Sequence, residues 1–455
     1  MVQAVMCCSV KNVLETDFHV SMHKVFAFGS DGASAMVGRN NSVTSRLKQV
    51  NQYLVNCHCV GHRCALSISQ AADVVPQIRT YRDSLCAVYS FYASSSIRKK
   101  KLLDFQEIFE GSKAPVTLKQ LHKVRWLSMS ECVSAMHRAW DGVCLSLEEE
   151  ASGRSGHPSA VAKGLCKQVA TAKYLLITAM LCDILNVVSQ LSKTFQAKDV
   201  DLSVVEPAVT LAINKLDLMK SEPSENYAFV LDALSDGKQQ YRNVGITDNT
   251  EQTKRDVANM AHKFIDAICS KLRDRFPQDE TSILVALDKV LNPKRLPVKA
   301  CDLRAHGGKY LTVLIEHYSS PDLDCHTPFI EANNLLTEWR NCSMMMHAER
   351  TLSLSDLCKL LLSTPQYVLQ YPNLVKLATV VLIIPVTSVE CERGFSCQNR
   401  IKTKFRARLQ NPTLNNLMQI TYFSEEHFCA EQLQDYLLAL GKWKAMRERC
   451  LLTQY

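Results

Sequence analysis

The chain has 455 residues, of which 47% are hydrophobic and 22% charged, and its formal net charge at pH 7 is +8. This composition excludes an intrinsically disordered chain, provides for a sizeable core in two or three domains, and permits a polyanionic partner without requiring one. The 19 cysteines are odd in number, and "MVQAVMCCSVKN" lacks a basic start followed by a long apolar run, so we expect reduced cysteines in an intracellular protein.

The first hundred residues predict an α/β arrangement. The apolar run at residues 24–28 fits a short buried strand, which the following "GSDG" breaks. Ser42 then caps a helix whose apolar residues, up to Val50, share one face. Residues 53–60 read as a second strand, and a helix follows and ends at Pro76.

From about Leu102 onward the pattern is almost entirely helical. Apolar residues recur at spacings of four and three along two segments, which predicts two helices with one buried face each. They are Ile177, Leu181, Ile184, Val188, Leu191 and Phe195 in the first segment, and Val257, Ala261, Phe264 and Ile268 in the second. The longest apolar stretch, residues 174–188, contains Asp183 and is too short to span a membrane, so we expect no membrane segment.

Asp31 lies just past the first predicted strand. Side chains at this end of a strand face the crevice where open α/β sheets bind ligands, and a carboxylate there can hold Mg²⁺ or Mn²⁺. The alternative is structural: Asp31 caps the next helix, and Gly32 supplies the turn.

A cluster of sulfur and imidazole side chains follows in "NCHCVGHRCAL". Cys59 and His62 have the Cys-x-x-His spacing of half a zinc site, but no second pair of ligands appears nearby. Packing of both residues across a strand-to-helix turn is the alternative, and we expect no bound metal.

Two further segments have both a functional and a structural interpretation. Trp126, beside Arg125, could stack on a base or belong to a helical core. The run from Arg98 to Lys101 fits either a nuclear import signal or a solvated helix face.

The segment from Ser388 to Leu409 places Glu390 and Glu392 ahead of a basic stretch without an acidic residue. Two interpretations are open: Glu392 once held a metal beside a nucleic acid backbone, or the segment is an amphipathic helix with a wet face. The candidate nucleic-acid-binding residues are Arg400, Lys402, Lys404, Arg406 and Arg408. The apolar residues fall mainly at helical spacing up to Asn411-Pro412, which breaks the helix, and a second apolar face follows. The residues expected in a dimer core or interface are Phe395, Ile401, Phe405, Leu409, Leu414 and Leu417.

Three blocks, in this order, resemble the hAT superfamily of DNA transposases and vertebrate proteins derived from it. They are "FGSDGASAMVGRNN…HCVGHRCALS", "VRWLSMSECVSAM" and "YPNLVKLATVVLIIPVTSVECERGFSCQNRIKTKFRARLQNPTLNNLMQI". The third is the most specific and resembles the family's C-terminal dimerisation region. The resemblance covers nearly the whole chain.

The resemblance implies a ribonuclease H-like core split by a long all-helical insertion. The expected domains are a partial core at 1–101, the insertion at 102–370, the dimerisation region with the returning core segment at 371–424, and an amphipathic helix at 425–455. The family's active site has two Asp and one Glu, which hold divalent metals. By motif match, Asp31 corresponds to the second Asp and Glu392 to the Glu. Trp126 resembles the Trp that the family uses near the cleavage site, and Cys59 and His62 match its Cys-x-x-His.

One departure from the family bears on catalysis. The family's first catalytic Asp lies on a strand well upstream of the "DGAS" block, whereas 30 residues precede Asp31 here and indicate one short helix and a turn. We therefore expect the first strands of the core to be missing. Asp31 and Glu392 would then be vestigial, because one flank of carboxylates does not hold a metal pair.

The leading hypothesis is a truncated or domesticated, non-enzymatic protein that forms a homodimer and binds nucleic acid without sequence preference. One alternative is an active hAT-type transposase or nuclease that uses Mg²⁺ or Mn²⁺; otherwise no cofactor is expected. Another is a scaffold for other nuclear proteins. We expect a nuclear location, with a cytoplasmic one as the alternative, and no membrane partner.

Overall fold

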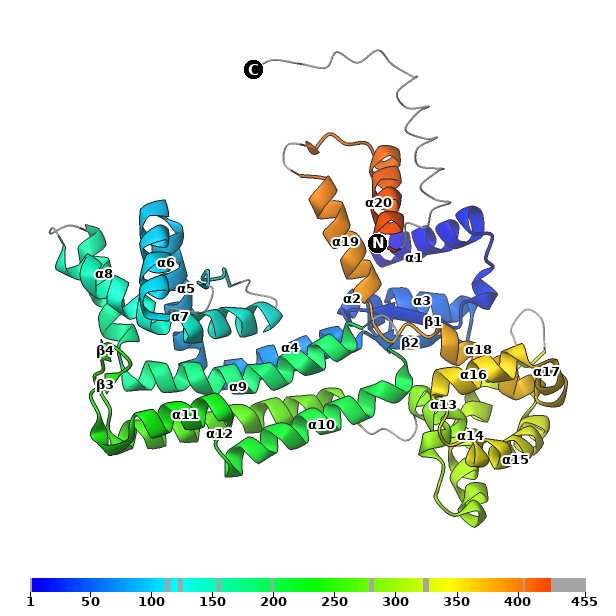
Figure 1. Cartoon of the computed structure of the whole chain (residues 1–455). Helices are drawn as coiled ribbons and strands as arrows, with labels where there is room; N and C mark the ends of the chain where they lie inside the picture. Colours follow the sequence, from blue (N-terminus) through cyan, green and yellow to red (C-terminus); the bar gives the residue numbers. More distant parts are fainter. Residues whose placement is uncertain are drawn as a thin grey trace. The chain divides into compact units, whose positions relative to one another are not determined.

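The structure is a computed structural model, and it describes residues 2–110, 115–121, 126–153, 157–197, 200–277, 282–321, 327–403 and 406–426. The chain divides into two compact units, Met1–Thr387 and Ser388–Tyr455. The described residues are mostly helical and contain two small two-stranded sheets (Figure 1). The mostly α character expected from the sequence is confirmed, and the four expected domain boundaries stay predictions.

A parallel pair of strands lies near the amino-terminal end of the first unit. Strand β1 (Ala27–Ser30) pairs with β2 (Val55–His58), with Ala27 opposite Val55 and Ser30 opposite His58. Both overlap the predicted strands, but β1 continues through Gly29 and Ser30, where the sequence predicted a break. Gly29 suits the strand because a Cβ there would lie 2.9 Å from Cγ of Pro385, which packs against it.

The crossover between the strands contains the predicted capped helix. In α3 (Val43–Val50), the Ser42 hydroxyl accepts a hydrogen bond from the Ser45 backbone N–H at 3.0 Å, and the Ser45 hydroxyl accepts one from the Ser42 N–H at 2.8 Å. This reciprocal capping box satisfies two backbone donors that the helix itself leaves free. The other elements of this region are α1 (Val2–Asn12), a π-helical turn (Val13–Asp17), a 3₁₀ turn (Met22–Lys24) and α2 (Ser34–Val37).

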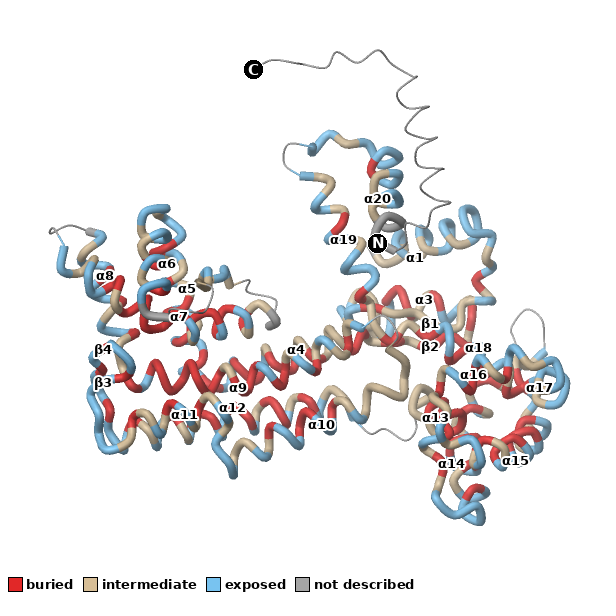
Figure 2. The backbone as a smooth tube through the Cα atoms, in the orientation of Figure 1, coloured by how far each residue is buried: buried red, intermediate tan, exposed pale blue. Residues whose placement is uncertain are grey.

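Long helices form the middle of the first unit, and the most buried of them is α9 (Ala172–Phe195). It packs against α4 (Val60–Val74), α7 (Trp126–Ser152), α8 (His157–Val169), α10 (Leu202–Ser221), α11 (Glu225–Ala233) and α12 (Glu251–Arg275). All six residues of its predicted apolar face are buried (Figure 2). The predicted face of α12 is buried as well. The other elements are α5 (Pro76–Ala93), α6 (Ser96–Glu110), and a small hairpin of β3 (Gln240–Tyr241) and β4 (Val244–Gly245). This hairpin is an exception within the segment expected to be wholly helical.

Asp183 of α9 forms hydrogen bonds to a neighbouring helix inside the protein, which identifies α9 as a core helix. The helix is long and apolar enough to cross a membrane by length and composition, although the sequence suggested a stretch too short to do so. The carboxylate of Asp183, however, accepts hydrogen bonds from the Ser224 hydroxyl at 2.5 Å and from the Tyr227 N–H at 3.0 Å. Asp183 thereby caps the amino-terminal end of α11 from a neighbouring helix. Since most of α9 is buried inside the protein, its apolar surface is used in the core.

The last part of the first unit is a cluster of shorter helices. They are α13 (Ile283–Leu291), α14 (Leu303–Tyr318), α15 (Ala332–Ala348), α16 (Leu354–Ser363), α17 (Pro365–Gln370) and α18 (Pro372–Ile383). Trp339 of α15 is buried at its centre, and its indole N–H donates to the carbonyl of Val290 at 3.2 Å. The ring packs so closely on Gly307 of α14 that a Cβ there would lie 2.1 Å from Cζ3 of Trp339.

This contact predicts opposite effects for two adjacent glycines. Gly307→Ala should lower the free energy of unfolding by about 2 kcal/mol, because the indole or the α14 backbone must move to admit the methyl group. Gly308→Ala is the matched control: no atom lies within 4 Å of the added Cβ, and alanine favours a helix over glycine by about 0.5–1 kcal/mol. Thermal denaturation followed by circular dichroism measures both. Equal midpoints for the two variants would contradict the predicted contact.

The second unit contains two described helices that contact each other, α19 (Val389–Ile401) and α20 (Asn411–Glu426). The sequence predicted one helix as far as Asn411-Pro412, and this was wrong: α19 ends at Ile401. The basic residues explain the early end, because Lys402 with Arg406 and Lys404 with Arg408 would be like-charge pairs four residues apart on a continued helix. Pro412 lies in the first turn of α20, a position where its missing N–H costs no hydrogen bond.

Candidate functional site

Asp31 follows β1, as the sequence predicts, and its side chain is exposed. One carboxylate oxygen accepts a hydrogen bond from the backbone N–H of Ala33 at 3.1 Å, just before α2. Gly32 has φ = +78°, a backbone conformation that favours glycine. The carboxylate therefore stabilises a local turn; its assignment as a former metal ligand stays a prediction.

His58 lies directly behind this turn. A Cβ at position 32 would come within 2.3 Å of the His58 ring, so Gly32 also allows the ring to pack here. The ring is hydrogen-bonded to the backbone of Asp31, and its Nε2 is buried without a hydrogen-bond partner in the described structure. Burial, followed by the charge of Arg63, lowers the pKa of His58, which keeps the ring neutral at pH 7.

The Cys-x-x-His pair lies where β2 passes into α4. Cys59 is buried at the start of α4, with its Sγ 3.8 Å from the hydroxyl of Thr387, and His62 is half-buried. Burial raises the pKa of the neighbouring thiols Cys57 and Cys64 to about 12, so both are protonated at pH 7. Among the described residues, no group of three or more His, Cys, Asp and Glu side chains is placed to hold a metal.

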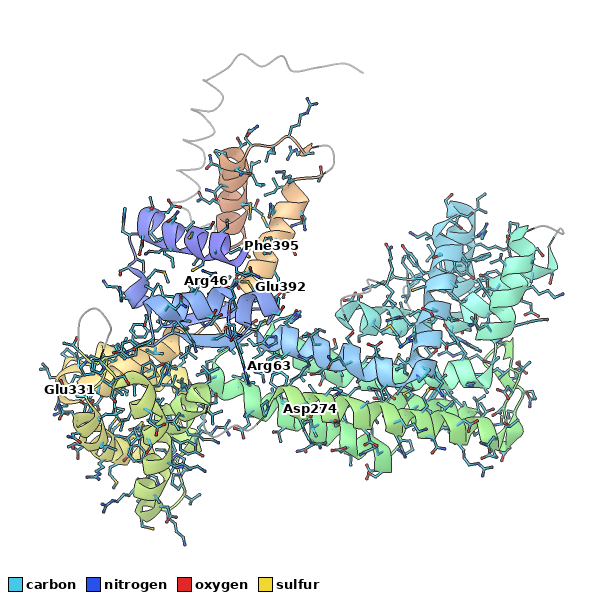
Figure 3. The ribbon with its side chains drawn as sticks, turned by 180° about the vertical axis from the view of Figure 1, so that it is seen from behind. Arg46, Arg63, Asp274, Glu331, Glu392 and Phe395 are labelled. Atoms are coloured by element: carbon cyan, nitrogen blue, oxygen red, sulfur yellow. The ribbon has the colours of Figure 1, made fainter. Side chains whose placement is uncertain are left out.

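Glu392 lies in the first turn of α19 and its side chain is exposed (Figure 3). Negative charge in this turn is favourable because it faces the positive end of the helix dipole. Glu390, two residues earlier, forms an ion pair with Arg393. Asp31 and Glu392 belong to different units, so their expected proximity stays a prediction.

The expected nucleic-acid-binding residues lie between and at the ends of two helices. Arg400 is in the last turn of α19, and Arg406 and Arg408 lie in the connection to α20; all three are exposed, while Lys402 is half-buried. Lys404 lies outside the described residues. Trp126 begins α7, and its side chain also lies outside the described part of the chain. The described basic residues therefore lie at the end of α19 and on a short connection, and not on the predicted continuous helix; their binding of nucleic acid stays a prediction.

The expected dimerisation residues divide by exposure. Leu414 is buried, whereas Ile401, Leu409 and Leu417 are half-buried. Phe395 is 65% exposed on α19. Phe405 lies outside the described residues. Leu414 is thus shielded from solvent, whereas most of the Phe395 side chain is exposed.

The sequence did not single out Arg63, which lies in the first turns of α4 one position after His62. Its guanidinium lies 4.2 Å from the centre of the Phe276 ring and donates a hydrogen bond to the carbonyl of Arg275. These partners lie more than 200 positions away, so no local pattern could reveal the contact.

A comparison with protein families gives one match. Residues 340–449 match the model described as the hAT family C-terminal dimerisation region. In the structure this segment begins within α15 and includes α16 to α20. It thus contains both Glu392 and the exposed Phe395.

Proposed function

Since this chain is an hAT-family, transposase-derived protein, we propose that it acts as a homodimer whose self-association depends on residues 340–449. The observation that carries this proposal is the match to the family's dimerisation region. The exposure of Phe395 within this region adds to it, because a large aromatic side chain on the surface is typical of the centre of an interface.

Sedimentation equilibrium of the full chain over a range of protein concentrations tests this proposal. We expect a mass of twice the 51.2 kDa of the chain at micromolar protein, falling towards the monomer on dilution. A strict monomer throughout the micromolar range would contradict it.

We also propose that the first unit retains part of a ribonuclease H-like core. The parallel pair β1 and β2, joined by a helical crossover, supports this proposal. A segment from the other end of the unit supports it further. The Val60 N–H donates to the carbonyl of Val386 at 3.1 Å, and Pro385 packs on Gly29. The chain thus returns to the first strands after the long helical segment, as a split core requires.

We further propose that this chain does not by itself cleave or join DNA. Asp31 accepts a hydrogen bond in a local turn, and the described residues of the first unit contain no three-ligand group beside it. Two-metal catalysis requires fixed carboxylates on both sides of the metal pair. We therefore expect no strand cleavage when the purified chain is incubated with Mn²⁺ and an oligonucleotide that carries inverted terminal repeats. Metal-dependent nicking that is lost in Asp31→Asn but kept in Asp73→Asn, a surface control on α4, would show that the chain is an active nuclease.

A secondary proposal is nuclear localisation with weak DNA binding. Arg400, Arg406 and Arg408 are exposed close together in the sequence, and cations of this kind bind phosphates without reading bases. In the run from Arg98 to Lys101, Arg98 and Lys101 form ion pairs with Glu150 and Glu149, while Lys99 and Lys100 are exposed. Lys99 and Lys100, which form no ion pair with any described residue, therefore remain for import.

The DNA-binding proposal predicts a salt dependence. If all five basic residues contact phosphates, the plot of log K against log salt should have a slope of about −4 to −5. Replacing all five by Ala should remove this binding in fluorescence anisotropy. The charge-matched control replaces five exposed lysines of the first unit: Lys48, Lys99, Lys100, Lys163 and Lys173. A flat salt dependence, or an equal loss in the control, would exclude the stretch as the site.

A further inference from the structure

A cavity of about 600 Å³ lies inside the first unit, where the end of β2 and the start of α4 meet α10, α13 and the carboxyl end of α12. Cavities of roughly 300–1,000 Å³ are typical of small-molecule sites. One part of its wall is apolar and includes Val205, Val209, Phe276 and Val285. The other part contains His58 and Arg63.

Arg63 is the cation on which the inference rests. Its guanidinium is packed on Phe276 and bonded to the carbonyl of Arg275. Among the described residues, no carboxylate lies within ion-pair distance of it. Burial, followed by the charge of Arg275, lowers the pKa of Arg63 to about 10. Arg63 is half-buried, and charges withdrawn from water are normally paired, but within the described part of the chain its guanidinium has no counter-ion.

The carboxylates of the cavity wall do not serve as counter-ions for Arg63. Asp288 is bound to Arg295, with 3.0 Å between the carboxylate and Nε, and to the Asn292 amide at 2.8 Å. Glu206 lies 2.6 Å from Arg295 and 3.6 Å from Lys289. Both acids are thus neutralised on their own side of the cavity, and neither of them pairs with Arg63.

A second observation at the same end concerns an atom without a partner. Nε2 of His58, which lines the cavity, is buried without a hydrogen bond in the described structure. Buried polar atoms are nearly always bonded, so this one indicates a missing polar ligand, and on the neutral ring Nε2 would accept a hydrogen bond from it. Arg63 has five N–H donors and Arg275 takes one, which leaves donors for such a ligand.

We propose that this cavity binds a small organic anion, with a carboxylate or phosphate group at Arg63 and an apolar body against Val205 and Phe276. The aromatic ring under the guanidinium fixes its plane, and the planar fork suits the two oxygens of either anionic group. This binding site is independent of self-association and of DNA binding.

Isothermal titration calorimetry of the full chain with four probes tests the proposal. The anionic probes are 1-naphthoate and 1-naphthyl phosphate, and we expect at least one to bind with saturation. The neutral methyl 1-naphthoate and inorganic phosphate each lack one half of the proposed ligand and should bind at least about tenfold more weakly. Comparing the two anionic probes distinguishes a carboxylate ligand from a phosphate ligand. Equal binding of the ester, equal binding of inorganic phosphate, or no saturable binding of either anion would overturn the proposal.

Two variants and a control locate the site. Arg63→Met should weaken the anionic probe at least about tenfold, and Val205→Phe should abolish binding by filling the cavity while leaving Arg63 in place. Arg79→Met, on α5 and outside the cavity, should bind as the unmodified chain does. If Arg63 serves only to cap α12, Arg63→Met will lower the melting temperature while Val205→Phe binds normally, and that result would also overturn the proposal.

Discussion

Phe395→Asp is expected to weaken self-association of the chain by about a thousandfold. The side chain is 65% exposed in α19, within the segment that matches the family's dimerisation region. Burying one phenylalanine is worth roughly 1.5–3 kcal/mol, and a two-fold symmetric interface contains each residue twice. The combined loss of about 4 kcal/mol corresponds to three orders of magnitude in Kd.

Sedimentation equilibrium at several concentrations measures this change. Phe229→Asp is the matched control, because Phe229 is 63% exposed on α11, outside the matched segment. The control should keep the Kd of the unmodified chain. An equal loss in both variants would point to a general effect of charge, and no loss in Phe395→Asp would exclude α19 from the interface.

The second large effect concerns stability. Glu338→Ala should lower the free energy of unfolding by about 3 kcal/mol. Glu338 of α15 is buried, and its carboxylate accepts hydrogen bonds from the N–H groups of Asn373 and Leu374 at 2.8 and 3.0 Å. It also accepts one from the Asn373 side chain at 2.5 Å. These are the first N–H groups of α18, so alanine would leave buried donors unpaired at a helix end, each worth about 1–3 kcal/mol.

Glu338→Gln separates the loss of hydrogen bonds from the loss of volume. It keeps the shape and one acceptor oxygen, so its destabilisation should be about half that of the alanine variant. Urea denaturation followed by tryptophan fluorescence is suitable because Trp339 is the next residue. If Glu338→Ala unfolds at the same urea concentration as the unmodified chain, the cap contributes nothing to stability.

Most features that depend on residues within one helix were predicted correctly from the sequence, whereas features that depend on distant residues were not. The buried faces of α9 and α12 and the Ser42 cap depend on residues within one helix, and all three were predicted correctly. The length of α19 was not, because apolar spacing was read without the repulsion between basic residues four positions apart. The structural role of Asp183 was not visible either, since its partners belong to another helix.

The candidate sites show the same limit. Motif spacing singled out Asp31, Cys59 and His62, because each was recognised from residues only a few positions away in the sequence. The cavity near Arg63 combines segments around residues 58, 205, 276 and 386, and its unpaired charge arises only when these segments meet. No spacing rule within one segment encodes that.

The junction between β2 and the segment around Val386 has a consequence for biosynthesis. Cys59 and Thr387, which meet there, are 328 positions apart. At about 5–20 residues per second, a ribosome needs roughly 20–60 s to cover that distance. Throughout this interval the nascent β1–β2 pair lacks its closing segment, and unpaired strand edges are prone to join other chains. The first strands therefore complete their packing only after nearly all of their own unit has been synthesised. During that delay we expect ribosome-associated chaperones to bind the growing chain.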